Sequence, residues 1–275
     1  MPVILRKIVH PINCAGDNKV LNIDFLQIND GEFAGIIDAG AGGSSVLGKI
    51  FCGLIRPRYG ELSLTGADGK KPGMAVFFDC GCEKAIFETS VEKEVCRRLR
   101  RTKTDKDELL LETQAALELV GFDYESIKNK SPFDLSKGDR RRIALAAVLA
   151  LRPDFLVLND PMRDMDGLWC ERLMELLKRI NRQGTAVILI SSETSRLAEA
   201  ADRIIILKDG CIVIDSSAKN VFSEYYGLLH LGLPVPEVRK CCQMLREQGM
   251  DMPNNIILYD QFIDRLKILM WRKNK

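Results

Sequence analysis

The feature that most constrains the fold is a glycine-rich loop between a short apolar strand and a helix. Residues 33–37 (FAGII) are predicted to form a buried strand, and a helix is expected from Leu47 to about Ile55. The loop between them reads Asp38-Ala39-Gly40-Ala41-Gly42-Gly43-Ser44-Ser45-Val46. A strand, a glycine-rich loop and a helix in this order form a turn whose backbone N–H groups bind phosphate. The segment therefore predicts a phosphate site, although a glycine-rich turn without a ligand has the same pattern.

Strand and helix patterns alternate along the rest of the chain, which predicts an α/β fold. The partial alternation of apolar residues from Val20 to Ile28 predicts a strand, and residues 29–32 a turn. Further strands are expected at residues 155–158, 186–190 and 204–207, followed by a hairpin through Asp209-Gly210. The first two of these are continuous apolar runs, as in parallel strands that are buried on both faces.

The helical segments divide the chain into a core and an appendage. Residues 88–152 are rich in charge and mostly helical in pattern, which predicts a helical subdomain inserted into the core. Beyond Val221 three prolines separate short helical segments. We therefore expect a core domain at 1–220 and a C-terminal helical appendage at 221–275.

Composition and charge exclude several classes of protein. A net charge of +2 provides no electrostatic attraction to nucleic acid, and the basic clusters at 97–101 and 140–142 are expected to be solvated helix faces. No apolar run approaches the ~18 residues that span a bilayer, and the N-terminus lacks the layout of a signal peptide. We expect a cytoplasmic chain that reaches a membrane only through a partner. The nine cysteines lack disulfide or zinc spacing and are expected to be reduced thiols.

Four further motifs follow the loop in a fixed order. They are Phe77-Phe78-Asp79 after a predicted strand, Leu135-Ser136-Lys137-Gly138-Asp139 at the start of a helix, Asn159-Asp160-Pro161 followed by Asp166, and Ser191-Ser192-Glu193 at the end of the next strand. In order and spacing these motifs resemble those of the ABC ATPase family across nearly the whole core. The resemblance implies a P-loop NTPase-like ABC ATPase domain with a mixed sheet, and ATP and Mg²⁺ as cofactors.

Two segments narrow the resemblance to energy-coupling-factor (cobalt and vitamin uptake) ATPase subunits. The appendage segments 231–238, 245–249 and 251–253 resemble the C-terminal region of those subunits, and residues 87–95 (FETSVEKEV) resemble the helical part that grips the membrane partner. The resemblance implies a dimer with a second ATPase subunit, identical or different, in which the appendage takes part. It also implies docking under a transmembrane T component, a separate substrate-binding S component, and a place at the cytoplasmic face of the membrane.

Several family positions carry unexpected residues here. The family's loop has a lysine where this chain has Ser44, while Ser45 matches the hydroxyl that meets Mg²⁺. Asn159 stands at the position of the acidic residue that supports Mg²⁺, and Asp160 at that of the catalytic glutamate. Asparagine lacks the charge, and aspartate is one methylene shorter than glutamate. A displacement of about 1 Å costs roughly 10²-fold in rate.

Two more positions carry residues that differ from those of the family, whereas the segment at 135–139 retains more of the family's residues. Phe78 stands at the position of the glutamine that senses the γ-phosphate, and Ser192 at that of the histidine that stabilises it. The segment at 135–139 keeps Ser136 and Gly138 of the family signature, with Lys137 and Asp139 replacing a glycine and a glutamine. In the family this segment completes the partner's site. Asp166 matches the aspartate of the family's D-loop, and the resemblance implies that it contributes to nucleotide binding. A helix that is merely capped by Ser136 remains the alternative.

The residues therefore predict an asymmetric subunit, whose own ATP site is too degraded for efficient hydrolysis while its signature segment supports a partner in trans. Two alternatives stay open at this point. One is an active ATPase with unusual residues. The other is a regulatory or scaffolding protein of ABC descent with no role in transport and no ATPase activity.

Overall fold

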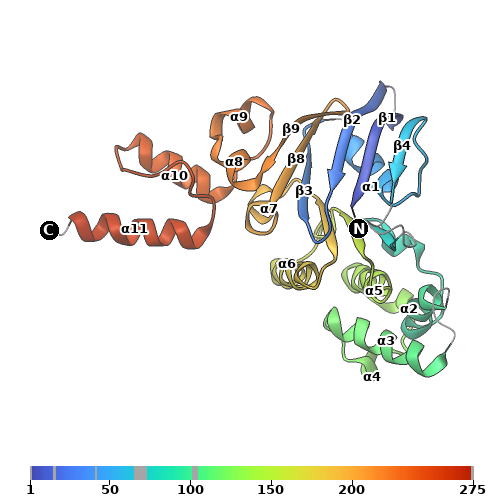
Figure 1. The fold of residues 1–275 in the computed structure, drawn as a ribbon. Coiled ribbons are helices and arrows are strands. Elements are labelled where there is room, and N and C mark those ends of the chain that lie inside the picture. Colours follow the sequence, from blue (N-terminus) through green and yellow to red (C-terminus); the bar gives the residue numbers. More distant parts are fainter. Residues whose placement is uncertain (1, 15–16, 41, 65–72, 101–104, 274–275) are drawn as a thin grey trace.

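The computed structural model describes residues 2–14, 17–40, 42–64, 73–100 and 105–273 of the chain (Figure 1). A six-stranded mixed sheet forms its centre, in the order β5-β6-β7-β3-β8-β9. All neighbours in this sheet are parallel except the β8–β9 pair. Its strands are β3 (Phe33–Asp38), β5 (Ala75–Asp79), β6 (Phe155–Asn159), β7 (Ala186–Ile190), β8 (Arg203–Lys208) and β9 (Cys211–Ser217). The predicted α/β class and mixed sheet are confirmed.

A second, three-stranded antiparallel sheet has the order β2-β1-β4. It contains β1 (Val3–Cys14), β2 (Asp17–Ile28) and β4 (Tyr59–Ser63). Strand β1 was not predicted, because a register shift between Arg6 and Val9 and a proline at position 11 interrupt its alternation. Pro11 pairs with Val20 of β2, two residues beyond the Val9–Tyr59 pair at which the pairing of β1 with β4 ends.

Helix α1 (Gly43–Phe51) lies between the two sheets. Its buried Leu47, Ile50 and Phe51 belong to one hydrophobic cluster with the inner faces of both sheets, and the rings of Phe51 and Phe155 are 5.9 Å apart. The helix begins four residues before the predicted Leu47 and ends at Phe51 rather than at Ile55. It ends early because Gly53 adopts a left-handed conformation, with φ of 67°.

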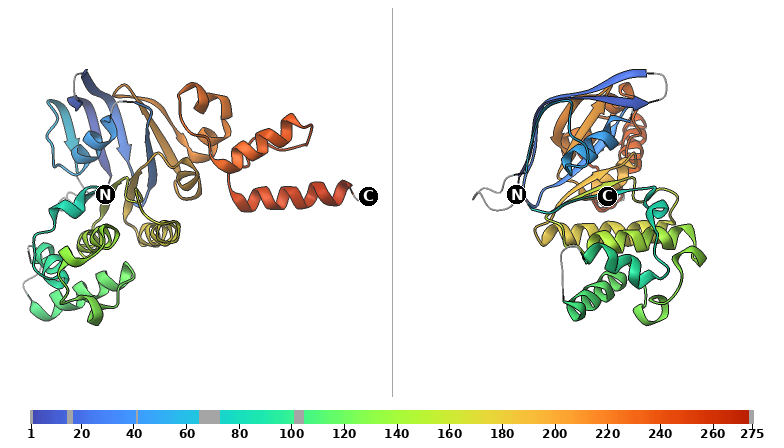
Figure 2. Two further views of the ribbon diagram at one scale, coloured as in Figure 1. Left: turned by 180° about the vertical axis from the view of Figure 1, so that it is seen from behind. Right: turned by 90° about the vertical axis from the view of Figure 1, so that its right-hand side faces the viewer.

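The opposite face of the central sheet is covered by helices. The second large hydrophobic cluster lies on this face and includes Phe33, Leu156 and Leu189 of the sheet. It is formed with helices α5 (Lys137–Leu149), α6 (Gly167–Arg182) and α7 (Thr194–Ala200). Helices α2 (Val91–Leu99), α3 (Lys106–Leu119) and α4 (Tyr124–Ile127) gather with α5 below the sheet, as both views of Figure 2 show. Short 3-10 turns η1 (Cys82–Ala85) and η2 (Pro132–Asp134) complete this part.

In the described part of the chain, four helices follow β9. They are α8 (Ala218–Ser223), α9 (Tyr225–His230), α10 (Glu237–Glu247) and α11 (Tyr259–Lys273). The first two contribute Phe222 and Leu228 to the second large cluster, and the last two extend away from the sheet (Figure 1). Between α10 and α11 lies a small cluster of its own, built on Cys242, Met252 and Ile256. None of the described helices is both long enough and apolar enough to cross a membrane.

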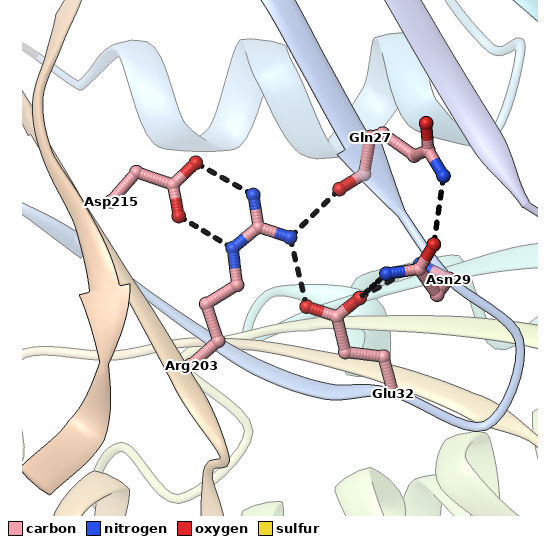
Figure 3. A network of polar contacts seen from close by, with 5 residues as sticks. All are labelled: Gln27, Asn29, Glu32, Arg203 and Asp215. Carbon is pink, nitrogen blue, oxygen red and sulfur yellow. Dashed lines mark hydrogen bonds and ion pairs between the residues drawn. The ribbon is translucent and has the colours of Figure 1, made fainter.

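A polar network fastens the two sheets to each other (Figure 3). Arg203 of β8 donates to both carboxylate oxygens of Asp215 on β9, to the carboxylate of Glu32 at 3.0 Å and to the Gln27 carbonyl of β2 at 2.9 Å. Glu32 in turn accepts from the backbone N–H of Asn29 at 2.8 Å, which closes the turn that leads into β3. These hydrogen bonds to carboxylates raise the pKa of the Arg203 guanidinium.

We expect Arg203→Ala to lower the free energy of unfolding by about 2 kcal/mol, because it leaves two partly buried carboxylates without their cation. The midpoint of urea denaturation measures this loss. Lys240→Ala is the control, since its exposed pair with Glu237 spans one turn of a surface helix and is worth at most about 0.5 kcal/mol. Equal effects of the two substitutions would contradict the role given to the network.

Candidate nucleotide site

The glycine-rich loop joins the carboxyl end of β3 to the start of α1, as predicted. Gly42 is the N-terminal cap residue of α1 and has a left-handed conformation (φ 77°). Because it is a glycine, it provides no side-chain hydrogen bond to the helix start. Gly43 and Ser44 are buried, whereas Ser45 and Val46 are partly exposed. Ala41, predicted to bind phosphate, lies outside the described residues. The loop therefore has the expected place in the fold.

A carboxylate of the chain itself lies against this loop. Asp38 accepts hydrogen bonds from the Gly40 N–H at 3.0 Å through one oxygen and from the Ser44 N–H at 2.9 Å through the other. The adjacent Ala39 N–H donates to the Leu207 carbonyl of β8 at 2.7 Å. From the sequence Asp38 was expected only as one member of the phosphate loop. Its folding back onto Ser44 was not anticipated.

The hairpin between β8 and β9 closes the other side of the loop. A Cβ placed on Gly40 would lie 3.6 Å from the Asp209 backbone nitrogen. The next residue, Gly210, has φ of 80°, and its carbonyl accepts a hydrogen bond from the Asn22 N–H at 2.8 Å. A Cβ at Gly210 would lie 2.0 Å from the Val20 carbonyl oxygen, so only glycine permits this contact between hairpin and small sheet.

The ends of β5 and β6 bring a second group of polar side chains together. The Asn159 amide donates to the Asp79 carboxylate at 3.0 Å, across the register pair that joins the two strands. Asp160 follows in a left-handed conformation (φ 46°), and its N–H donates to the Ile190 carbonyl at 2.9 Å. Burial raises the pKa of the Asp160 carboxyl; Arg163 opposes this rise, and Glu193 and Asp79 add to it. Ser192 is exposed in the turn before α7.

Phe78, which stands at the position of the glutamine that senses the γ-phosphate, faces away from these polar side chains. Its side chain is 1% exposed and lies in the cluster beneath the helices, so it does not reach the polar edge of the sheet. Alternation along β5 explains this, because Phe77 faces α1 and Phe78 faces the opposite side. The side chain of β5 that meets Asn159 is that of Asp79, which the sequence analysis did not consider.

The signature segment forms a capped helix start. The Ser136 hydroxyl accepts from the Asp139 N–H at 3.1 Å and donates to the Asp139 carboxylate at 2.8 Å, and Arg142 pairs with the same carboxylate at 3.1 Å. Asp166 caps α6 in the same way, accepting from the Trp169 N–H at 2.8 Å. Ser136, Gly138, Asp139 and Asp166 line one shallow hollow, and no residue of the loop at 38–46 is among its described lining residues. Within one chain, the signature segment at 135–139 and the glycine-rich loop at 38–46 therefore lie on separate surfaces.

Comparisons with known proteins agree with this fold and motif order. A family model described as "ABC transporter" matches residues 21–163. An energy-coupling factor transporter ATP-binding protein EcfA2 of Clostridium perfringens is 30% identical over 266 residues, which cover 92% of each chain. Its namesake in Acetivibrio thermocellus is 32% identical over 88% of each chain. A putative ABC transporter ATP-binding protein of Methanosarcina acetivorans is 30% identical over 97% of this chain and 93% of its own.

Solved structures show the same fold at lower identity. The structure of cbiO1 from Clostridium perfringens, described as part of the ABC transporter complex cbiONQ, superposes with a TM-score of 0.66 at 22% identity, covering 88% of this chain and 98% of that one. A dimeric ATP-binding cassette in a post-hydrolysis state, bound to ADP and Pi, gives a TM-score of 0.64 at 20% identity over 78% and 98%.

The fold and the ordered motifs define an ATP-binding cassette of the ABC transporter class. Within that class, the chain belongs to the family of energy-coupling factor transporter ATP-binding proteins. Both the general resemblance and its narrower form, inferred from the sequence, are confirmed.

Two polar groups at the predicted nucleotide and magnesium positions of this chain form hydrogen bonds within the chain. The Ser44 N–H is bonded to Asp38, and Ser44 itself carries no charge. The Asn159 amide is held by Asp79. Ser45 and Asn159 thus remain predictions as magnesium ligands.

We expect the purified chain to turn ATP over at least ~100-fold more slowly than a working ABC ATPase, since each lost charge-stabilising group typically costs that much. Phosphate release measures the rate. Ser44→Lys alone should change the rate little, because positions 160 and 192 still lack the glutamate and the histidine that the family has there. A wild-type rate within tenfold of a working enzyme would contradict this assessment of the site.

Proposed function

We propose that this chain is the catalytically weak ATP-binding subunit of an energy-coupling factor transporter. It couples ATP binding and hydrolysis at a dimer interface to the uptake of a vitamin, metal ion or similar small molecule. The observation that carries the proposal is the likeness to ATP-binding proteins of such transporters over about nine-tenths of both chains. In this proposal the chain lies at the cytoplasmic face of the membrane, beside a second ATPase subunit, a T component and, indirectly, an S component.

An apolar groove supports docking to the transmembrane T component. It lies where the core meets the helical subdomain and is lined by Leu54, Val76, Phe87, Arg97 and Leu151, among others. The Phe87 side chain is 71% exposed, and the Arg97 guanidinium lies over its ring at 5.6 Å. An exposed aromatic ring at the rim of an apolar groove is typical of a contact that anchors a partner.

The charged residues of the same segment have structural roles. Glu94 is 2% exposed, accepts from the Phe87 and Glu88 N–H groups at 3.0 and 3.1 Å, and pairs with Arg97 at 2.6 Å. Glu92 accepts from the Tyr124 hydroxyl. Glu94 thus holds the loop that presents Phe87, and Glu92 joins α2 to α4, so substituting either would disturb folding as well as docking.

Phe87→Ala should weaken co-purification with the T component by about 30-fold, which corresponds to roughly 2 kcal/mol for an interfacial aromatic anchor. Leu111→Ala is the matched control, since Leu111 is 67% exposed on α3 and does not line the groove. The amount of T component retained by the tagged chain measures the effect. Equal retention by both variants would argue against this groove as the docking site.

The α10–α11 appendage is proposed to pair with the second ATPase subunit. Its surface exposes Met244, Met270 and Trp271, which are large apolar side chains for two short helices. Apolar side chains of this size on an extension are favourable contacts for a partner. The domain division at residue 220 belongs to the same proposal.

The signature segment is proposed to complete the partner's ATP site in trans. Ser136, Gly138 and the start of α5 present a hydroxyl and backbone N–H groups at the positive end of a helix, which favours a γ-phosphate. The Asp139 carboxylate opposes this with its negative charge, which the Arg142 guanidinium partly neutralises, and it accepts a hydrogen bond from the Ser136 hydroxyl. In a regulatory or scaffolding protein, Ser136 would only cap the helix and would contact no γ-phosphate. The ATPase activity of the assembled complex therefore distinguishes this function from support of the partner's site.

Ser136→Asp should reduce ATPase activity of the assembled complex by about 10²–10³-fold, because it places a negative charge beside the partner's γ-phosphate. Ser136→Asn has nearly the same size and also caps helices well, so it should stay within about tenfold of wild type. Asp160→Asn should change the activity little.

Phosphate release by complexes of verified composition measures all three. If Asp160→Asn silences the complex and Ser136→Asp does not, the working site is this chain's own and the asymmetric arrangement is wrong.

A further inference from the structure

The Asp38 carboxylate occupies the place in the loop where an anion is expected. Its two oxygens bind the N–H groups of Gly40 and Ser44, which lie on either side of the loop. Ser44 is the second residue of α1, and Gly42 caps this nine-residue helix without a side chain. Asp38 therefore supplies the negative group that a helix N-terminus attracts, from the strand that precedes the helix.

A nucleotide phosphate and this carboxylate compete for the same donors. Phosphate-binding loops hold phosphates through the N–H groups at the start of the helix. The Ser44 N–H is one of these, and it already has an acceptor at 2.9 Å. A phosphate at this helix end would also bring its negative charge close to the carboxylate, and the two would repel each other.

The remainder of the loop offers little to offset that repulsion. Ser44 is 7% exposed and carries no charge. A Cβ on Gly43 would lie 3.0 Å from Cδ1 of Ile12, so an apolar side chain packs against the first residue of α1. On the hairpin side the nearest carboxylate is that of Asp209, whose Oδ1 would lie 3.7 Å from a Cβ on Gly40. Asp209 pairs with Lys19 at 3.3 Å.

We propose that Asp38 is an internal anion that occupies the phosphate-binding positions of its own loop and excludes nucleotide phosphates from this chain's site. Asp38 is then a specificity-determining residue. The weak activity proposed for the site follows from the presence of the Asp38 carboxylate as well as from the loss of family residues such as the lysine at position 44. The inference rests on the proposed function, in which this chain's own site is the weak one of the pair.

The test measures binding of labelled ATP to the full-length chain by equilibrium dialysis. All variants carry Ser44→Lys, which supplies the charge that a phosphate loop needs. In that background, Asp38→Asn removes the negative charge, and Asp38→Gly removes the acceptor as well. Asp209→Asn is the matched control, because it removes one carboxylate beside the loop without releasing the Gly40 or Ser44 N–H group. Asparagine also tolerates the left-handed conformation of residue 209 (φ 50°).

We expect Asp38→Asn and Asp38→Gly each to tighten ATP binding at least tenfold relative to Ser44→Lys alone, and Asp209→Asn to leave it within twofold. Thermal melting identifies the folded variants, and either Asp38 variant suffices. The proposal is overturned if folded Asp38 variants bind no tighter than Ser44→Lys alone. It is equally overturned if Asp209→Asn tightens binding as much, since bulk charge would then explain the effect.

Failure of this inference is distinguishable from failure of the proposed function. Assembly with a T component and the response of the complex to Ser136 variants do not depend on Asp38. A chain that assembles normally while its Asp38 variants gain no affinity for ATP would remain a transporter subunit without an internal anion.

Discussion

Burial of α1 between two sheets is the constraint on which the rest of the molecule depends. The helix belongs to a cluster with Val3 of the small sheet and with Ala34 and Val157 of the central sheet. It thereby holds the two sheets together. Burying one large apolar side chain is worth roughly 1.5–3 kcal/mol, and α1 buries Leu47, Ile50 and Phe51. Packing of the helix between the sheets holds the loop that precedes it at the carboxyl edge of β3. The Arg203 network and the hairpin tip at Gly210 then fix the two sheets around it.

The same edge of the sheet explains why lost family residues leave a folded protein. Carboxyl ends of parallel strands meet there, so polar side chains can pair with one another when no ligand needs them. Asn159 pairs with Asp79, and Asp38 pairs with its own loop. Both contacts satisfy groups that a nucleotide site would leave for the ligand. In the arrangement proposed above, internal hydrogen bonds at the sheet edge occupy groups that a preorganised catalytic site would direct at its ligand.

The sequence predicted those parts of the fold that depend on local pattern. Strands β6 and β7 were recognisable because burial on both faces gives continuous apolar runs, and the hairpin because Asp209-Gly210 suits its turn. The place of the loop and the class of site followed from motif order. The facing of Phe78 and Asp79 did not, because it depends on the register of β5 against β6. The fold-back of Asp38 onto Ser44 was also out of reach, since periodicity says nothing of a bond within an irregular loop.

The small cluster between α10 and α11 has a consequence for turnover of the protein. Among the described residues it has three buried side chains, Cys242, Met252 and Ile256, with four partly buried ones packed against them, and it is separate from the two large clusters of the body. A segment with so small a core opens locally at low free energy, long before the sheets do. Proteases attack such open forms first, and any protein bound over the appendage protects it by mass action. Cellular abundance of the chain would then follow the supply of its binding partner, and surplus copies would be removed from the tail inward.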